Sequence, residues 1–325
     1  MSKAGFIKQW PANCYYKFIC LYVIKCRSGC GRTHSAIPGS FLFNFSKQNL
    51  PMKTFLVPTD FSETALNAAK FAVQMAATVE NAEVILYNVF DDIKSSAVDA
   101  AVKSNVISRH EIMIAILEKM QQALTDIAPV SIRVVAEPGE LMKNLPAFAE
   151  SQMADMIVMG INGASRVKQV LMGSNAINII SETTCPVLIV PPGASFQGIN
   201  KVLLSSDFKN VDNTIPALTI IKILNMFKPE LHIMNVDSEH FVELTEEYKT
   251  EKTKMDVMFS DYNPEYAFLR FYDFEEGIDT YVNDKEISMI ITIPRKHSFL
   301  AKIFKTSHTR ELAFHTNVPL LAIHN

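Results

Sequence analysis

Three glycines and a serine, spread over residues 160–174, are the residues of this sequence best suited to chemistry. Gly160 and Gly163 form a Gly-x2-Gly pair directly after an apolar run, and Gly173-Ser174 follows nine residues later, where a helical pattern begins. Glycine allows a turn with positive φ and lets a ligand approach the backbone. The unpaired N–H groups of a helix start favour anions. Two such turns predict a nest of N–H donors around a polyphosphate, with the Ser174 hydroxyl either capping the helix or binding the terminal phosphate.

Other phosphate-binding and catalytic patterns do not occur in the sequence. It contains no Gly-x4-Gly-Lys-[Ser/Thr] loop, and no paired carboxylates, Ser-His-Asp set or positioned base accompany the glycine motif. Arg166 and Lys168 lie in the nine-residue spacer, where they either help to neutralise phosphate or are simply solvated. Cys185 precedes Pro186 and a strand, which favours a packed thiol over a nucleophile. The sequence therefore predicts binding rather than an enzyme, and leaves weak hydrolysis open.

Strands and helices that could position this motif alternate from Met52 onward. Continuous apolar strands separated by amphipathic helices are typical of a parallel sheet covered on both faces, and right-handed crossovers then give a doubly wound, Rossmann-like sheet. Ligands of such sheets bind beyond the carboxyl ends of the strands. We expect strands at 53–57, 83–88, 131–136, 155–159 and 187–190, and helices at 63–78, 97–127, 139–152 and 175–183.

The strand pattern restarts after the Pro/Gly-rich break at 191–195, and Asp207-Phe208 then echoes Asp60-Phe61. A gapless shift of 133 positions matches the segment 156–188 to 289–321, including Pro186 to Pro319. Such matches indicate an internal duplication. The sequence thus predicts an α/β fold of two tandem doubly wound domains, 52–195 and 199–325, each a five-stranded, mainly parallel sheet with helices on both faces. The strands expected in the second domain are 201–205, 230–235, 265–272, 287–292 and 319–323.

The segment Met156–Pro192 resembles the signature of the universal stress protein family, whose ATP-binding members carry Gly-x2-Gly-x9-Gly-Ser/Thr. Val57–Ser62 is similar to the family's first strand with its acidic residue, and Asn88-Val89 stands where the family usually has His-Val. The resemblance is strong in the first half and weak in the second. It implies a nucleotide-dependent regulatory or stress-response protein that binds ATP, with or without Mg²⁺, and acts on an unknown protein partner. A slow ATPase or nucleotidyl-transfer enzyme and a nucleotide-free interaction module remain alternatives.

The resemblance also implies roles for individual residues of the ATP site. Asp60 matches an acidic residue beside the nucleotide, although an N-cap or turn role would also explain it. The remaining matches are Pro58, Thr59 and Val89, whose backbone would frame adenine and ribose; Gly160 and Gly163, beside the ribose and phosphates; and Gly173, Ser174 and Asn175 at the terminal phosphate.

The second copy departs from the motif at its glycines. Gly160, Gly163 and Gly173 correspond to Ile293, Lys296 and Thr306, while Ser307 and Asp207 remain. A β-branched residue at a turn that needs positive φ is strongly disfavoured, and its side chain would fill ligand space. We therefore expect no nucleotide in the second domain. Its basic loop from Pro294 onward is either solvated or binds an anionic partner or a different ligand.

Composition limits the partners and the location. The chain has 325 residues, a net charge of −3 and a pI near 6.3, which argues against a general nucleic-acid binder. No apolar run approaches the length of a membrane span. Cys185 is the only cysteine after residue 51, which fits a reducing, cytoplasmic environment.

The first 51 residues differ from the rest, with seven Lys and Arg, no Asp or Glu, and four of the five cysteines. A zinc site or a signal peptide would be alternatives, but the cysteine spacing lacks a C-x2-C pair and no small-residue cleavage site stands out. We favour a disordered appendage or a reading frame that starts at Met52.

In universal stress proteins, domains often pair through their last strands. We therefore expect Pro186–Val190 and Pro319–Ile323 to pair within this chain as a pseudo-dimer, which would protect both sheet edges. A further homodimer is left open.

Overall fold

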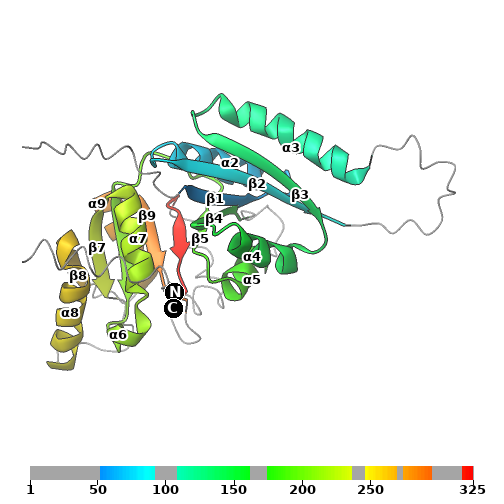
Figure 1. Cartoon of the computed structure of the whole chain (residues 1–325). Coiled ribbons are helices and arrows are strands. Elements are labelled where there is room, and N and C mark those ends of the chain that lie inside the picture. The colour runs from blue at the N-terminus through cyan, green and yellow to red at the C-terminus, as the bar shows by residue number, and fades with distance from the viewer. Residues whose placement is uncertain are drawn as a thin grey trace, which may run out of the picture. The chain divides into compact units, whose positions relative to one another are not determined.

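The computed structural model of the chain describes residues 52–91, 108–161, 174–235, 246–268, 274–294 and 317–324. They form a ten-stranded sheet in the order β3-β2-β1-β4-β5-β10-β9-β6-β7-β8, within one compact unit (Figure 1). The predicted α/β fold with a mostly parallel sheet is confirmed. The strands are β1 (Lys53–Pro58), β2 (Ala82–Phe90), β3 (Ser131–Pro138), β4 (Met156–Gly160), β5 (Val187–Val190), β6 (Lys201–Ser206), β7 (Glu230–Asn235), β8 (Glu265–Phe268), β9 (Met289–Thr292) and β10 (Leu320–Ala322).

Helices cover both faces of this sheet, so successive side chains of the central strands are all buried. Phe55, Leu56 and Val57 in β1 are fully inaccessible to solvent, which explains why the strand sequences are apolar without alternation. One face packs against α2 (Glu63–Ala76), α3 (Arg109–Thr125), α6 (Val211–Thr214), α7 (Ala217–Phe227) and α8 (Glu246–Met258). The other face packs against α4 (Leu141–Ser151), α5 (Ser174–Glu182) and α9 (Phe274–Lys285). None of the described helices is both long and apolar enough to cross a membrane.

The sheet consists of two five-stranded parts that we call the front half (β1–β5 with α2–α5) and the rear half (β6–β10 with α6–α9). Counted outward from the junction, the front order β5-β4-β1-β2-β3 is repeated as β10-β9-β6-β7-β8. The halves join where β5 pairs antiparallel with β10, with Leu321 opposite Leu188, and β10 is the red strand beside β5 in Figure 1. The other pairings are parallel. The carboxyl ends of the front strands and of the rear strands therefore lie at opposite edges of the sheet.

Rare backbone conformations recur at corresponding places in the two halves. Non-glycine residues have positive φ after β1 and β6, before β2 and β7, and before β4 and β9. Such residues are uncommon, so their repetition favours an internal duplication. The pairs are Phe61 (64°) and Phe208 (53°), Asn81 (56°) and Lys228 (53°), and Met153 (49°) and Glu286 (56°). The first two pairs are each separated by 147 positions and the third by 133, the separation found in the sequence.

The first crossover helix differs between the halves. In the front half α2 runs without interruption over Glu63–Ala76, whereas in the rear half Ile215-Pro216 separates the short α6 from α7. Proline has no N–H to donate and its ring clashes with the preceding turn, so it interrupts the rear helix. The helix predicted at 97–127 begins only at Arg109, because Ser108 is its extended N-cap and accepts from Glu111 N at 3.2 Å, so the predicted start was wrong. Residues 97–107 lie outside the described ranges.

Candidate functional site

Three neighbouring strands of the front half end at the same edge of the sheet. β1 lies between β2 and β4, with Pro58 opposite Tyr87 and Leu56 opposite Ile157. Pro58 is the last residue of β1, Gly160 is the last residue of β4, and Val89 is the penultimate residue of β2. After β1 the chain continues into β2 on one side of β1, and it later returns to the other side of β1 as β4. The edge beside β1 and β4 is therefore the topological switch point at which doubly wound sheets bind ligands.

The turn after β1 fixes Thr59 and Asp60 at this edge. The Thr59 hydroxyl oxygen accepts a hydrogen bond from Phe61 N at 3.0 Å, and Asp60 Oδ1 accepts one from Ser62 N at 3.0 Å. Ser62 then caps α2, accepting from Ala65 N at 3.2 Å. The side chain of Asp60 is exposed, so the structure gives it a role in the turn while leaving it within reach of a ligand.

Gly160 is required for a reason that differs from the one predicted. The turn was expected to need positive φ here, but the described glycines with positive φ are Gly139 and Gly198, so this expectation was wrong. A Cβ at Gly160 would lie 2.3 Å from the carbonyl oxygen of Thr64 and 2.7 Å from its carbon. Gly160 is therefore needed because the first turn of α2 packs directly on the end of β4.

Asn88, next to Val89, contributes a polar group that was not assigned a role from the sequence. Its side chain is 6% exposed, and its Nδ2 donates to the carbonyl oxygen of Thr59 at 2.8 Å. Among the described residues, its Oδ1 has no hydrogen-bond partner. A buried acceptor without a donor costs free energy, so this atom suits a water molecule or a ligand donor such as an amino group.

The phosphate-binding part of the predicted site is described only in part. Gly163 and Gly173, with Arg166 and Lys168, fall in the range 162–173, outside the described residues. Ser174 and Asn175 are the first two residues of α5, and only their backbone is described. Helix α5 is anchored by the buried side chains of Ala176, Ile179 and Ile180.

The rear half repeats the turn after its first strand. Ser206 Oγ accepts from Phe208 N at 3.1 Å, and Asp207 Oδ1 accepts from Lys209 N at 3.2 Å, as Thr59 and Asp60 do in the front half. The local fold of this turn is thus independent of the glycine motif.

Aromatic side chains pack together at the rear edge, whereas among the described residues of the front edge the corresponding phenylalanine is partly exposed. Phe208 is 2% exposed and stacks on Tyr248 with ring centroids 5.0 Å apart, whereas the corresponding Phe61 is 36% exposed. Tyr248 also hydrogen-bonds Asn235, which corresponds to Asn88. Ile293, at the position of Gly160, is buried in the same hydrophobic cluster as Phe208. Lys296, Thr306 and Ser307 lie outside the described ranges.

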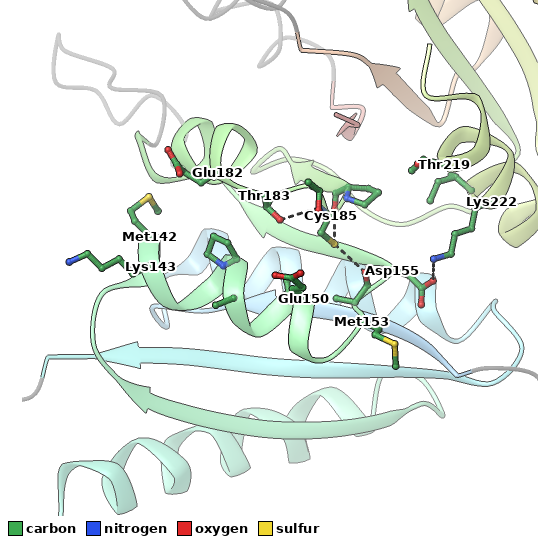
Figure 2. A pocket seen from close by; sticks show the side chains of 17 residues that line it. Met142, Lys143, Glu150, Met153, Asp155, Glu182, Thr183, Cys185, Thr219 and Lys222 are labelled. Atoms are coloured by element: carbon green, nitrogen blue, oxygen red, sulfur yellow. Dashed lines mark hydrogen bonds and ion pairs between the residues drawn. The ribbon is translucent and has the colours of Figure 1, made fainter. Parts of the chain in front are cut away.

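A second concave site lies at the amino ends of β4 and β5, at the sheet edge opposite the switch point. This pocket of about 820 Å³ is lined by α4, by the loop before β5 and by α7 of the rear half (Figure 2). At its wall Cys185 Sγ donates to the carbonyl oxygen of Ala154 at 3.3 Å, and Cys185 N donates to Thr183 Oγ1 at 3.1 Å. Burial, followed by the negative charge of Asp155, raises the pKa of the Cys185 thiol to about 12.

Cys185 should accordingly be a slow nucleophile in the folded protein. At pH 8 its thiolate fraction is very small, so we expect alkylation by iodoacetamide to be roughly a hundredfold slower than in urea-unfolded protein. Mass mapping of the peptide that contains Cys185 measures this separately from the four cysteines before residue 52. Equal rates in the folded and unfolded protein would contradict the packed-thiol interpretation.

Neither edge offers a metal site within the described ranges, where no group of three or more His, Cys, Asp or Glu side chains converges. The described carboxylates therefore specify no particular cation.

Comparison with known proteins agrees with this architecture. The profile described as "Universal stress protein family" matches residues 51–191. Universal stress protein MJ0531 of Methanocaldococcus jannaschii is 33% identical over 144 residues, which are 42% of this chain and 81% of that protein. A universal stress protein structure from Archaeoglobus fulgidus aligns over 85% of this chain and 99% of its own with a TM-score of 0.62, and its 18% identity makes this a likeness of fold. A universal stress protein solved in complex with cAMP covers only 43% of this chain, with 26% identity and a TM-score of 0.33. The chain belongs to the universal stress protein family.

Proposed function

We propose that this protein is an ATP-binding regulatory protein whose front half holds the nucleotide at the carboxyl ends of β1, β2 and β4. Occupancy would shift its conformation or its affinity for a protein partner, which requires that ATP bind two states with different affinity. The described residues offer no positioned base or paired carboxylates at this edge, so the proposal is for binding rather than for catalysis.

The observation that carries the proposal is the convergence of Pro58, Thr59, Asp60, Val89 and Gly160 at the switch point. The unpartnered Oδ1 of Asn88 supports it, because a buried acceptor at this edge fits the amino group of a base. In the proposed site Gly163, Gly173, Ser174 and Asn175 surround the phosphates. A divalent cation would be held chiefly by the phosphates, since Mg²⁺ commonly binds through substrate oxygens.

We further propose that residues 52–195 and 199–325 are two tandem universal stress protein domains, of which the second is degenerate. Support comes from the repeated strand order, the three repeated positive-φ pairs and the repeated turn at Asp60 and Asp207. Ile293 and the stacked Phe208 and Tyr248 would leave no room for a nucleotide at the rear edge. The proposed location is the cytoplasm, where Cys185 would remain a thiol.

The test is to identify the small molecule that co-purifies with the native full-length chain. Denaturation should release ATP or ADP at up to one per chain. Asp60→Asn keeps an oxygen that accepts from Ser62 N but removes the charge. Because a carboxylate accepts from the N–H or O–H groups of base and ribose more strongly than an amide does, we expect about a tenfold weaker ATP affinity by calorimetry.

The matched control is Asp207→Asn, which makes the same change in the same turn of the rear half. ATP affinity should not change in this variant. An equal loss in both variants, or a wild-type chain that neither carries nor binds adenine nucleotide, would refute the proposed site.

A further inference from the structure

A buried carboxylate lies where the front half meets the rear half. Asp155, just before β4, is 5% exposed, and its Oδ2 accepts from Thr54 N at 2.8 Å. Its Oδ1 lies 2.7 Å from Lys222 Nζ and 3.7 Å from Lys53 Nζ. Lys222 belongs to α7 of the rear half, and Figure 2 shows its side chain pointing to Asp155 at one end of the pocket. The cation closest to this front-half carboxylate therefore belongs to the rear half.

The equivalent position in the rear half is uncharged. Ser288, 133 residues after Asp155, lies just before β9, and its Oγ accepts from Lys201 N at 3.0 Å. It binds the start of β6 as Asp155 binds the start of β1. The residue of α2 that corresponds to Lys222 at the 147-residue separation is Met75, which is fully buried. The pair Asp155 and Lys222 is therefore replaced by Ser288 and Met75 in the duplicate.

The sequences of β5 and β10, the two strands that join the halves, do little to select one pairing strand over another. β5 (VLIV) and β10 (LLA) are short and apolar, and they pair through backbone hydrogen bonds that any apolar strand can make. The exposed edge of β5 in a folding chain could therefore pair with β10 or with β5 of a second copy. A front-to-front pairing would put α2 in the place of α7, and Asp155 would then meet Met75 instead of Lys222.

We propose that the Asp155–Lys222 ion pair specifies the partner of β5: it favours the rear half of the same chain and opposes pairing with a second front half. A buried charge that loses its counter-ion is strongly destabilising, whereas neutral groups of matched polarity are tolerated. In a front-to-front complex Asp155 would keep only Lys53, whose Nζ lies 3.7 Å from its Oδ1, and a charge that loses its closest partner in the wrong complex is a general means by which interfaces reject partners. The rear half thus provides both a strand edge and the cation that makes this edge the preferred one.

The first test asks whether a second substitution rescues the first, in urea unfolding of the full chain. Lys222→Met should raise the unfolding equilibrium constant on the order of tenfold or more, because it leaves Asp155 without its nearest cation. Lys119→Met, an exposed lysine of α3, should leave it nearly unchanged. Adding Asp155→Asn to Lys222→Met keeps an acceptor for Thr54 N and removes the charge, so most of the loss should be recovered. Loss of packing alone would not be recovered in this way.

The second test measures the choice of partner. Tagged and untagged chains are unfolded together in urea, refolded together, and captured through the tag. Capture of untagged chains should rise about threefold or more in Asp155→Asn/Lys222→Met relative to wild type, because the penalty on front-to-front pairing is gone. The proposal is overturned if Lys222→Met is as stable as Lys119→Met, if Asp155→Asn fails to rescue it, or if the double variant captures no more than wild type.

Discussion

Replacing Gly160 by alanine should destabilise the protein by about 2–3 kcal/mol, measured as the free energy of urea unfolding. The added Cβ would lie 2.3 Å from the Thr64 carbonyl oxygen, and the atoms in its way are backbone at the start of α2. Relief requires the helix to move away from β4, which would disturb the packing of the whole front half.

Gly193→Ala is the matched control for this variant. The Cβ there would meet Asn317 Oδ1 at 2.4 Å, but this atom is the end of a side chain that can rotate away. We expect a loss below about 1 kcal/mol. Equal stability losses at the two positions would contradict a backbone clash at Gly160. Because Gly160→Ala is expected to move α2, loss of nucleotide in that variant would not identify a ligand contact, and the charge change at Asp60 is the cleaner probe.

Replacing Phe208 by alanine should destabilise the protein by about 3–5 kcal/mol, the usual cost of removing a buried phenylalanine. The ring stacks on Tyr248 and lies near Tyr266 and Phe268, with centroid distances of 6.1 and 6.4 Å, so its removal would leave a cavity at the carboxyl edge of the rear half. Unfolding in urea, followed by circular dichroism, measures the loss.

Phe61→Ala provides the comparison, because Phe61 occupies the corresponding turn of the front half with a similar positive φ. The backbone penalty of the substitution is therefore common to both variants. Phe61 is 36% exposed, so we expect a loss of only about 1 kcal/mol. If the two variants lost equal stability, the rear edge would not be closed by a packed aromatic cluster, and the proposed contrast between the two edges would fail.

The sheet could be predicted because its strands are short, continuously apolar and separated by helical patterns. A strand such as β1 is buried by helices on both faces, and this leaves a local signal in the sequence. A turn role was one alternative that the sequence offered for Asp60, and its side chain does accept from Ser62 N. The similar bond of the Thr59 side chain to Phe61 N was not predicted.

Other features depend on residues far apart in the chain and left no local signal. The steric need for Gly160 arises from Thr64, and positive φ was the wrong reason for it. The aromatic closure of the rear edge joins Phe208 to Tyr248 from another element. Pro216 is visible in the sequence, but no break of the first crossover helix of the second domain was predicted from it.

The antiparallel junction of β5 with β10 has a consequence for how the sequence can change. When two identical chains associate about a two-fold axis, every substitution appears twice, and a residue that helps one side must also be accepted by the other. Here both partners are encoded in a single polypeptide, so each position can vary alone. Lys222 can arise opposite Asp155 in the rear half without a lysine at the corresponding position of the front half. Likewise, aromatic rings can fill the carboxyl ends of the rear strands while the front half keeps Gly160. Covalent linkage of the two halves thus allows corresponding positions to differ in sequence, which a symmetric assembly of identical chains does not allow.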